Sequence, residues 1–237
     1  MHNNKKKTKI FCDSADLKII KRYSKNKFVK GFTTNPSLMR IAGAKNYKKY
    51  SQELLRASKK KAISFEVFAD NYKEMKNQAY EINSWGKNVY VKIPIINTKG
   101  KFTGKLIKHL SYNGVKLNIT AVYTFEQVKK IFRCLNKNSF TIISIFAGRM
   151  ADVGKDPIPI IKKSVMLTKK SKKIEILWAS TREAYNYTQA YQCGCEIITM
   201  PPSIIEKILK FGKTFNKLTS DTVKTFYKDA YKSNFKI

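Results

Sequence analysis

The segment Val89-Tyr90-Val91-Lys92-Ile93-Pro94 decides the fold that this sequence predicts. Apart from one lysine its residues are apolar and mostly β-branched or aromatic, which is typical of a strand buried on both faces in a parallel sheet. Segments with helical periodicity separate eight runs of this kind. The runs cover residues 9–12, 29–33, 62–68, 88–93, 115–119, 140–146, 174–179 and 196–199. Strand–helix units in this order predict an α/β fold, a closed (β/α)8 TIM barrel with its helices outside.

An open, doubly wound sheet is the alternative, and it would need a glycine-rich phosphate loop. Neither GxGxxG nor GxxxxGK[ST] occurs in the sequence, so the closed barrel is preferred. No internal repeat, low-complexity stretch or Pro/Gly linker divides the 237 residues. We therefore predict one domain over residues 1–237, with the barrel at about residues 9–210.

A helical tail is expected at about residues 214–233, after the eighth strand–helix unit. Apolar positions at helical spacing would form one stripe on it: Val223, Phe226, Tyr227, Ala230 and Tyr231. The stripe could pack against the protein's own barrel. Because it is aromatic and terminal, it could also dock on a neighbouring subunit, and the sequence leaves both interpretations open.

The formal charge of +32 raises the question of an anionic partner such as nucleic acid. Only six of the 48 cationic residues are arginine, the better ligand for phosphate and for guanine edges. The lysines are spread along the chain, and the richness in Asn, Ile and Tyr indicates the compositional bias of an AT-rich genome. We therefore expect neither nucleic acid nor a membrane as a partner, although a positive field could draw sugar phosphates toward a cleft.

Several absences in the sequence predict a cytoplasmic protein. No run approaches the roughly 18 apolar residues that span a bilayer. The basic residues 1–9 are not followed by the apolar segment of a secretory signal. The four cysteines lack paired metal-ligand spacing, which fits a reduced compartment. His2 and His109 are the only histidines, which argues against histidine triads and His-ligated metal sites.

Polar residues lie at the carboxyl end of nearly every predicted strand, where a βα barrel places its chemistry. They are Asp13, Asn35, Glu66, Lys92, Thr120, Ser144 with Arg149, and Ser180 with Arg182. Alone, Asp13, Asn35 or Thr120 would more often be an ordinary helix N-cap. Together, the strand-end residues predict one shared site.

Lys92 is the candidate nucleophile. Inside a buried strand it loses hydration, which disfavours the charged ammonium, and a neutral amine can attack a carbonyl to form an imine. An imine acts as an electron sink for cleavage of a carbon–carbon bond. The alternative is a lysine that extends out of the strand end into water.

Two arginines and one glutamate supply further candidate functions. Arg149 and Arg182 follow the sixth and seventh strands, and guanidinium groups there could bind phosphate. A salt bridge to Asp152 is the alternative for Arg149. Glu66 lies in an apolar strand, where burial would suit it to acid–base work, and it would need a lysine or water partner.

Six segments match the motifs of one family, in the family's order. They are Phe11-Cys-Asp13-Ser-Ala-Asp16, Gly31-Phe-Thr33-Thr34-Asn35-Pro36-Ser37, Val91-Lys92-Ile-Pro94, Leu117-Asn118-Ile-Thr120-Ala-Val-Tyr, Ser144-Ile-Phe146-Ala-Gly148-Arg149-Met-Ala-Asp152 and Ala179-Ser180-Thr-Arg182. The second segment is highly specific. Over roughly residues 9–210 the chain resembles the transaldolase family, including its small members that are similar to fructose-6-phosphate aldolase.

The resemblance implies a (β/α)8 barrel in which Lys92, on strand four, forms an imine with a ketose phosphate. Glu66 and Thr120 would hold a water that relays protons, and Asp13 would be the acid/base at the cleaved hydroxyl. The implied substrate contacts are Asn35 and Ser144 at the dihydroxyacetone unit, Arg149, Ser180 and Arg182 at the distal phosphate, and Thr33 and Phe146 within the matched motifs. No metal or organic cofactor is implied.

The resemblance also bears on the reaction. Transaldolases have Glu on strand three and Phe in the strand-six motif, whereas the aldolase subgroup has Gln and Tyr there. Glu66 and Phe146 therefore favour transfer of dihydroxyacetone between sugar phosphates in the pentose phosphate pathway. A fructose-6-phosphate aldolase and a non-catalytic basic binding protein are the alternatives.

Two departures from the family pattern, Ile145 in place of a proline and Thr181 in place of Phe or Lys, could reshape the phosphate pocket. By family analogy we expect a homo-oligomer, a ring-type pentamer or decamer.

Overall fold

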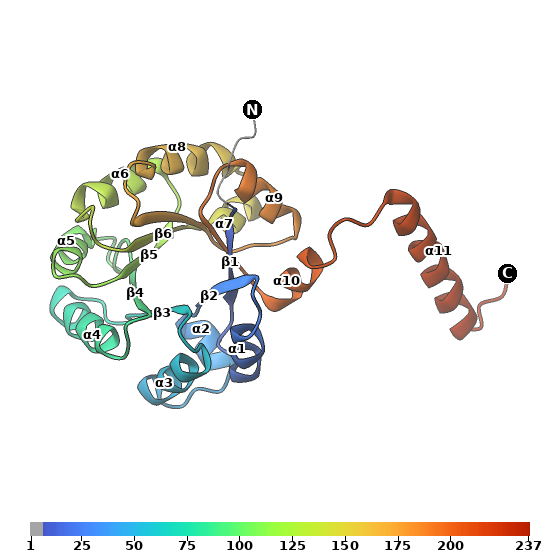
Figure 1. Cartoon of the computed structure of the whole chain (residues 1–237), viewed down its shortest axis with the longest axis horizontal. Helices are drawn as coiled ribbons and strands as arrows, with labels where there is room; N and C mark the ends of the chain where they lie inside the picture. The colour runs from blue at the N-terminus through green and yellow to red at the C-terminus, as the bar shows by residue number, and fades with distance from the viewer. Residues whose placement is uncertain (1–6) are drawn as a thin grey trace.

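The computed structural model describes residues 7–237, and its centre is a closed barrel of eight parallel strands in chain order. The strands are β1 (Lys9–Asp13), β2 (Val29–Thr33), β3 (Ala62–Glu66), β4 (Val89–Pro94), β5 (Leu117–Val122), β6 (Thr141–Ile145), β7 (Ile174–Trp178) and β8 (Ile197–Met200). Pairing of β1 with β8 closes the barrel, and the helices form a ring around it (Figure 1). The predicted TIM barrel is confirmed.

Helices follow the strands and cover the outside of the barrel. They are α1 (Leu17–Ser24), α2 (Pro36–Ile41), α3 (Tyr47–Ala57), α4 (Tyr72–Ser84), α5 (Gly104–Tyr112), α6 (Phe125–Cys134), α7 (Ala147–Asp152), α8 (Ile158–Thr168), α9 (Tyr185–Gln192), α10 (Pro202–Ile208) and α11 (Phe215–Lys232). Side-chain N-caps explain several helix starts, because Asp16, Asn46 and Asn71 each accept a hydrogen bond from a backbone N–H in the first turn.

Two separate apolar clusters account for the stability of this architecture. The larger one lies between the strands and the surrounding helices and includes Phe32, Phe65 and Trp178. The smaller one consists of Phe11, Ile142, Leu177, Ala179 and Ile197, which come from β1, β6, the end of β7, and β8. Side chains alternate along a strand, so this second cluster fills the barrel interior. Both faces of each strand are therefore buried, as the apolar runs predicted.

The predicted strands are all present, with ends that differ by three residues or fewer. The third run was predicted to reach residue 68, but β3 ends at Glu66 and the Phe68 side chain is 61% exposed. The chain turns there toward α4, and the amide oxygen of Gln78 accepts hydrogen bonds from the backbone N–H groups of Phe68 and Ala69. Hydrophobicity alone could not show this side-chain cap.

The C-terminal helix α11 stands away from the barrel (Figure 1). None of its residues is buried, and Val223, Phe226, Tyr227 and Tyr231 are exposed by 60% to 77%. The helix itself was predicted correctly, but packing of its stripe against its own barrel is wrong.

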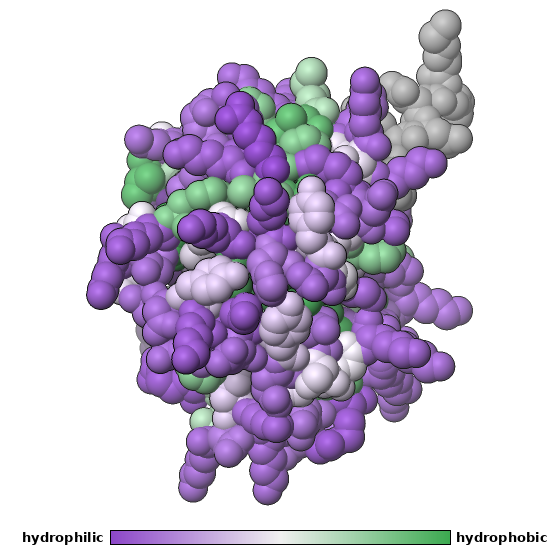
Figure 2. Space-filling view, turned by 90° about the vertical axis from the view of Figure 1, so that its left-hand side faces the viewer, coloured by the Kyte–Doolittle hydropathy of each residue, from purple (hydrophilic) through white to green (hydrophobic). Residues whose placement is uncertain are grey.

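The outer surface of the barrel is mainly hydrophilic on the side formed by α4, α5 and α6, where only small apolar patches appear (Figure 2). No helix within residues 7–237 is both long and apolar enough to cross a membrane. The prediction that the amino terminus lacks a secretory signal concerns mainly residues 1–6, which lie outside the described residues.

Candidate active site

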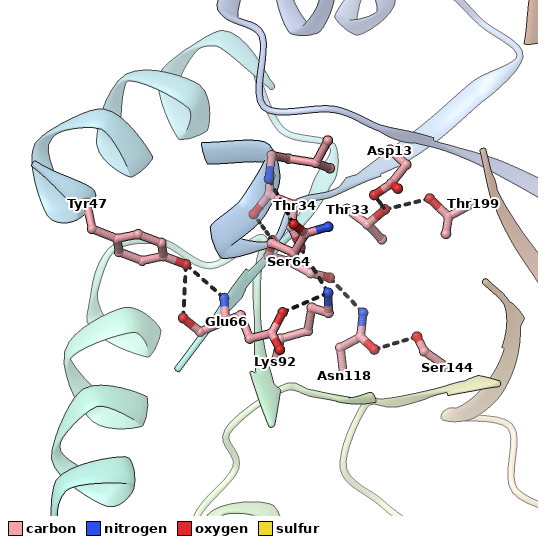
Figure 3. A network of polar contacts seen from close by, with 12 residues as sticks. Asp13, Thr33, Thr34, Tyr47, Ser64, Glu66, Lys92, Asn118, Ser144 and Thr199 are labelled. Carbon is pink, nitrogen blue, oxygen red and sulfur yellow. Dashed lines mark hydrogen bonds and ion pairs between the residues drawn. The ribbon is translucent and has the colours of Figure 1, made fainter. Parts of the chain in front are cut away.

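Lys92 and Glu66 form an ion pair at the carboxyl ends of β4 and β3. The two residues are register partners, and Lys92 Nζ lies 3.0 Å from Glu66 Oε2. Their side chains are only 9% and 18% exposed. Lys92 Nζ also donates a 3.0 Å hydrogen bond to the backbone oxygen of Thr34 (Figure 3). Lys92 therefore points into the barrel and does not extend into solvent, and Glu66 has the lysine partner that its burial required.

A layer of polar side chains lies directly above the apolar interior of the barrel. Tyr90 packs against the inner cluster, and Lys92 follows it two residues later on the same face of β4. The same step of two residues separates Phe11 from Asp13, Ala62 from Ser64, Ile142 from Ser144, and Ile197 from Thr199. Strand alternation thus brings polar groups from five strands to one level of the barrel.

Ser144 enters this layer through Asn118 on β5. Ser144 Oγ donates to Asn118 Oδ1 at 2.7 Å, and Asn118 Nδ2 donates to Ser64 Oγ at 3.0 Å (Figure 3). All three side chains are buried. Neither Ser64 nor Asn118 was among the predicted site residues, although each lies two residues before a predicted one, Glu66 and Thr120.

Asp13 is held by Thr33, which in turn bonds to Thr199. Thr33 Oγ1 donates to Asp13 Oδ1 at 2.6 Å and lies 2.5 Å from Thr199 Oγ1. Since Thr33 has one hydroxyl proton and gives it to Asp13, the Thr199 hydroxyl is the donor to Thr33. Burial of the Asp13 carboxyl raises its pKa, while the hydrogen bond from Thr33 and the charge of Lys92 oppose the rise. A raised pKa suits a carboxyl group that must both accept and return a proton near neutral pH.

Thr120 presents an unsatisfied polar atom to the site. It is buried in β5, two residues after Asn118, and its Oγ1 has no hydrogen-bond partner among residues 7–237. Ala121 follows with a φ of 60°, where the β5–β6 register shifts. A buried hydroxyl of this kind normally has a partner, and water or substrate can supply one.

Tyr47 fixes the backbone of Glu66 from outside the barrel. Its hydroxyl donates to Glu66 O at 2.9 Å and accepts from Glu66 N at 3.0 Å (Figure 3). Its ring packs edge-on against Phe68, with centroids 5.2 Å apart. Burial raises the pKa of the Tyr47 hydroxyl, which remains protonated and can donate. Nothing in the sequence pattern singled out Tyr47, because it lies on a helix 19 residues before Glu66.

Asn35 is in part the ordinary N-cap that its sequence position allowed. Its Oδ1 accepts a 2.9 Å hydrogen bond from the backbone N–H of Leu38 at the start of α2. Its Nδ2 donates no hydrogen bond within the described residues and is available to a ligand oxygen. The capping bond and a substrate contact are therefore compatible.

Gly148 locks the end of β6 against the end of β7. A Cβ atom at this position would lie 1.6 Å from the backbone oxygen of Ser180, and Gly148 N donates to Ala179 O. Ser180 has a φ of 61°, a strained value for a residue with a side chain. The close contact of the two loops thus sets the positions of both Ser180 and Arg149.

The two predicted phosphate-binding arginines line one surface pocket of about 840 Å³ beside these loops. The guanidinium of Arg149 lies 5.5 Å from the ring centroid of Phe146. Arg182 forms a two-pronged ion pair with Asp152, with its Nε 3.0 Å from both carboxylate oxygens. The salt bridge to Asp152 considered for Arg149 is therefore wrong, since Asp152 pairs with Arg182. Both partners are almost half exposed, so a bound phosphate could compete for Arg182.

Comparison with known proteins gives the family. The model of the family "Transaldolase/Fructose-6-phosphate aldolase" matches residues 10–237. This chain belongs to that family. A probable transaldolase from Nitrosopumilus maritimus is 31% identical over 93% of this chain and 94% of its own length. One from Dehalococcoides mccartyi is 32% identical over 87% of this chain and 92% of its own.

Solved structures agree with the fold of this transaldolase-family chain. The flavin-binding domain of flavocytochrome b2 from baker's yeast superimposes with a TM-score of 0.55, at 14% identity, over 83% of this chain and 57% of that one. At this identity the likeness concerns the barrel alone. The family membership and the geometry at Lys92 together support an enzyme of the transaldolase/aldolase kind.

Proposed function

We propose that this chain is a transaldolase that transfers a dihydroxyacetone unit through an imine on Lys92. The observation that carries the proposal is the ion pair of Lys92 and Glu66, which places an amine and a proton acceptor 3.0 Å apart inside the barrel. The donor would be sedoheptulose 7-phosphate or fructose 6-phosphate. The acceptor would be glyceraldehyde 3-phosphate or erythrose 4-phosphate, as in the pentose phosphate pathway.

The first half-reaction cleaves the donor. Glu66 takes a proton from Lys92, and Nζ adds to the C2 carbonyl of the ketose. Loss of water leaves a protonated imine, with Thr120 and Glu66 holding that water for proton transfer. Asp13 then removes the proton of the C4 hydroxyl and the C3–C4 bond breaks. Its electron pair moves into the imine to give an enamine, and the shortened aldose phosphate leaves.

The second half-reaction reverses these steps on the acceptor. C3 of the enamine attacks the aldehyde carbon, Asp13 returns its proton to the new hydroxyl, and water hydrolyses the imine. Asn35, Thr33 and Ser144 would orient the dihydroxyacetone carbons. Arg149, Ser180 and Arg182 would bind the distal phosphate, with Phe146 beneath the Arg149 guanidinium. Glu66 and Phe146 favour transfer over cleavage. The family resemblance implies Glu and Phe at these positions in transaldolases, and Gln and Tyr in the aldolase subgroup.

Borohydride trapping tests the imine. Incubation with fructose 6-phosphate and borohydride should leave a covalent adduct on Lys92, which peptide mass spectrometry would locate. Lys92→Met should abolish the adduct. Lys61→Met is the matched control, since Lys61 is also a partly buried lysine but donates only to backbone oxygens of Tyr23 and Asn26. An adduct on any other lysine, or none, would overturn the proposal.

Omission of the acceptor tests the transfer step. Fructose 6-phosphate with erythrose 4-phosphate should yield sedoheptulose 7-phosphate and glyceraldehyde 3-phosphate. Release of glyceraldehyde 3-phosphate at the same rate without erythrose 4-phosphate would identify an aldolase instead.

We also propose that the enzyme is a cytoplasmic homo-oligomer in which α11 docks on a neighbouring subunit. The exposed stripe of Val223, Phe226, Tyr227 and Tyr231 supports this, because an aromatic face of this size is normally covered. Light scattering on the full chain and on Phe226→Ser/Tyr227→Ser should show a smaller assembly for the variant. An unchanged mass would contradict this role of α11.

A further inference from the structure

Lysines are concentrated at the amino end of the barrel, opposite the end that holds Lys92. Seven connections lead from a helix to the following strand, and together they contain twelve lysines and one carboxylate, Glu196. The twelve lysines are Lys25, Lys27, Lys59, Lys60, Lys61, Lys87, Lys116, Lys137, Lys169, Lys170, Lys172 and Lys173. We call the surface that they form the amino-end face.

The opposite end of the barrel has balanced charge. The connections from a strand to the following helix contain the cations Lys99, Lys101 and Arg182 and the carboxylates Asp16, Asp70 and Glu183. A uniform compositional bias would enrich both ends equally. In the sequence the lysines look evenly spread because a helix-to-strand connection recurs in almost every βα unit. The barrel brings these connections together on one face.

The charges of the amino-end face lack carboxylate partners, although Lys61, Lys116, Lys137 and Lys173 donate hydrogen bonds to backbone oxygens. Ten of its twelve lysines are exposed, and none forms an ion pair within residues 7–237. The Glu196 carboxylate accepts a hydrogen bond from Ile176 N, and the nearby Glu175 is paired with Lys9. Burial lowers the pKa of Lys61, and the charges of Lys30 and Lys59 lower it further. Lys59 is thus close enough to Lys61 to repel it.

We propose that the amino-end face binds the surface of an anionic lipid bilayer. Its lysines come from six connections distributed around the barrel, so a planar anionic surface can contact all of them at once, whereas a nucleic-acid duplex could contact only a strip. Phe28 and Phe140 lie among them and are 57% and 45% exposed, which suits insertion at the headgroup level. Binding in this orientation leaves the Lys92 end of the barrel open to solution.

The composition of the face also favours lipid over nucleic acid. The only cation in the connections is lysine, a hydrated point charge, and they contain no arginine, the residue that binds phosphate in two-pronged fashion and stacks on bases. Arg22 and Arg56 lie beside Lys25 and Lys59 in one pocket, so lysine still supplies most of the charge of the face. The Phe140 ring already has Lys116 and Lys173 within 5.5 and 5.1 Å of its centroid, so it offers little ring face to a base. This proposal concerns the other end of the barrel and does not depend on the proposed reaction. It departs from the expectation that the protein has no membrane partner.

Sedimentation of the full chain with vesicles tests the proposal. At about 0.15 M salt the protein should pellet with vesicles of phosphatidylglycerol and phosphatidylcholine but not with phosphatidylcholine alone. A face variant, Lys59→Gln/Lys60→Gln/Lys172→Gln/Lys173→Gln, should bind roughly 600-fold more weakly, since each of the four lysines contributes about fivefold. The control variant, Lys18→Gln/Lys108→Gln/Lys130→Gln/Lys163→Gln, loses the same charge from exposed helix positions and should bind nearly as the wild type does.

Three outcomes would overturn the proposal. The first is no binding to the anionic vesicles, and the second is an equal loss of vesicle affinity in both variants. The third is binding of the amino-end face to a 30-nucleotide RNA duplex that is tighter than its binding to the vesicles. The second would show an effect of net charge alone, and the third would identify nucleic acid as the partner. Circular dichroism and thermal unfolding of both variants confirm that each is folded, so that weak binding reports the surface and not the fold.

Discussion

Lys92 Nζ lies 3.0 Å from Glu66 Oε2, and the two residues are register partners on neighbouring strands of a closed barrel. Both side chains are largely buried. Removal of either partner would therefore leave the other with an uncompensated charge or without its hydrogen bond.

Glu66→Gln keeps the shape of the side chain but removes the proton acceptor next to Lys92. Donor turnover should fall by about 10² or more, as expected when a general acid/base is lost. The family resemblance implies that the aldolase subgroup has Gln at this position. The remaining activity should therefore shift from transfer toward cleavage without an acceptor. Steady-state assays with and without erythrose 4-phosphate measure both effects. Glu126→Gln, on the exposed surface of α6, is the control and should change neither.

Asp13→Asn removes the group assigned to the C4 hydroxyl. Carbon–carbon cleavage should slow by about 10²–10⁴, while the imine at Lys92 still forms. Borohydride trapping and single-turnover cleavage measured on the same variant separate the two steps. Loss of trapping together with cleavage would place Asp13 in imine formation instead.

Tyr47→Phe removes the hydroxyl that bonds both backbone groups of Glu66. We expect a loss of about 1–2 kcal/mol in the free energy of unfolding, because two buried backbone groups lose their partner. A decrease in kcat with little change in KM is also expected, as Glu66 loses its fixed position beside Lys92. Tyr50→Phe is the matched control: Tyr50 lies one turn further along α3, and its hydroxyl donates to Ala15 O instead. Equal effects of the two substitutions on kcat would contradict a positioning role.

Gly148→Ala puts a methyl group where the Ser180 carbonyl lies, 1.6 Å from its oxygen. The β6 and β7 loops must move apart, so stability should fall by about 1–3 kcal/mol. KM for phosphorylated donors should rise because Arg149 and Ser180 shift with these loops. Gly86→Ala is the control, since the nearest atoms to its added Cβ belong to side chains: the flexible end of Leu55 at 3.1 Å and Asn88 Oδ1 at 3.4 Å.

Glu196 predicts a pH dependence of stability. Burial raises the pKa of its carboxyl to about 7 in the folded protein, from 4.5 for the free group. Between these values the folded state binds the extra proton, so stability falls as the pH rises from about 4.5 to 7. Glu196→Gln removes this slope, so the stability of the variant relative to the wild type should be about 3 kcal/mol greater at pH 8 than at pH 4. Urea unfolding at both pH values measures it, and a difference that does not change with pH would contradict the assignment.

Much of the fold followed from local pattern. Apolar runs without a polar face predict strands buried on both sides, and eight of them with helices between leave the closed barrel as the favoured topology. Glu66, Lys92 and Asp13 were found because an ionisable residue at the end of such a run is costly without a function or a partner. The side-chain layer that surrounds them was predicted only in part: Ser64, Asn118 and Thr199 lie within their strands, before the strand ends at which the site residues were sought.

The sequence by itself determined which residues lie at strand ends, and therefore that Lys92, Glu66 and Asp13 lie at the same end of the barrel. Only the tertiary structure decided which of them touch, because contacts such as Lys92 with Glu66 and Tyr47 with Glu66 depend on strand register and helix packing over 19 residues or more. It also decided that α11 leaves its own barrel and that Arg182, not Arg149, pairs with Asp152. The lysines show the same division: spacing along the chain made them look uniform, and closure of the barrel gathered twelve of them on one face because every helix-to-strand connection of a βα barrel lies at the same end.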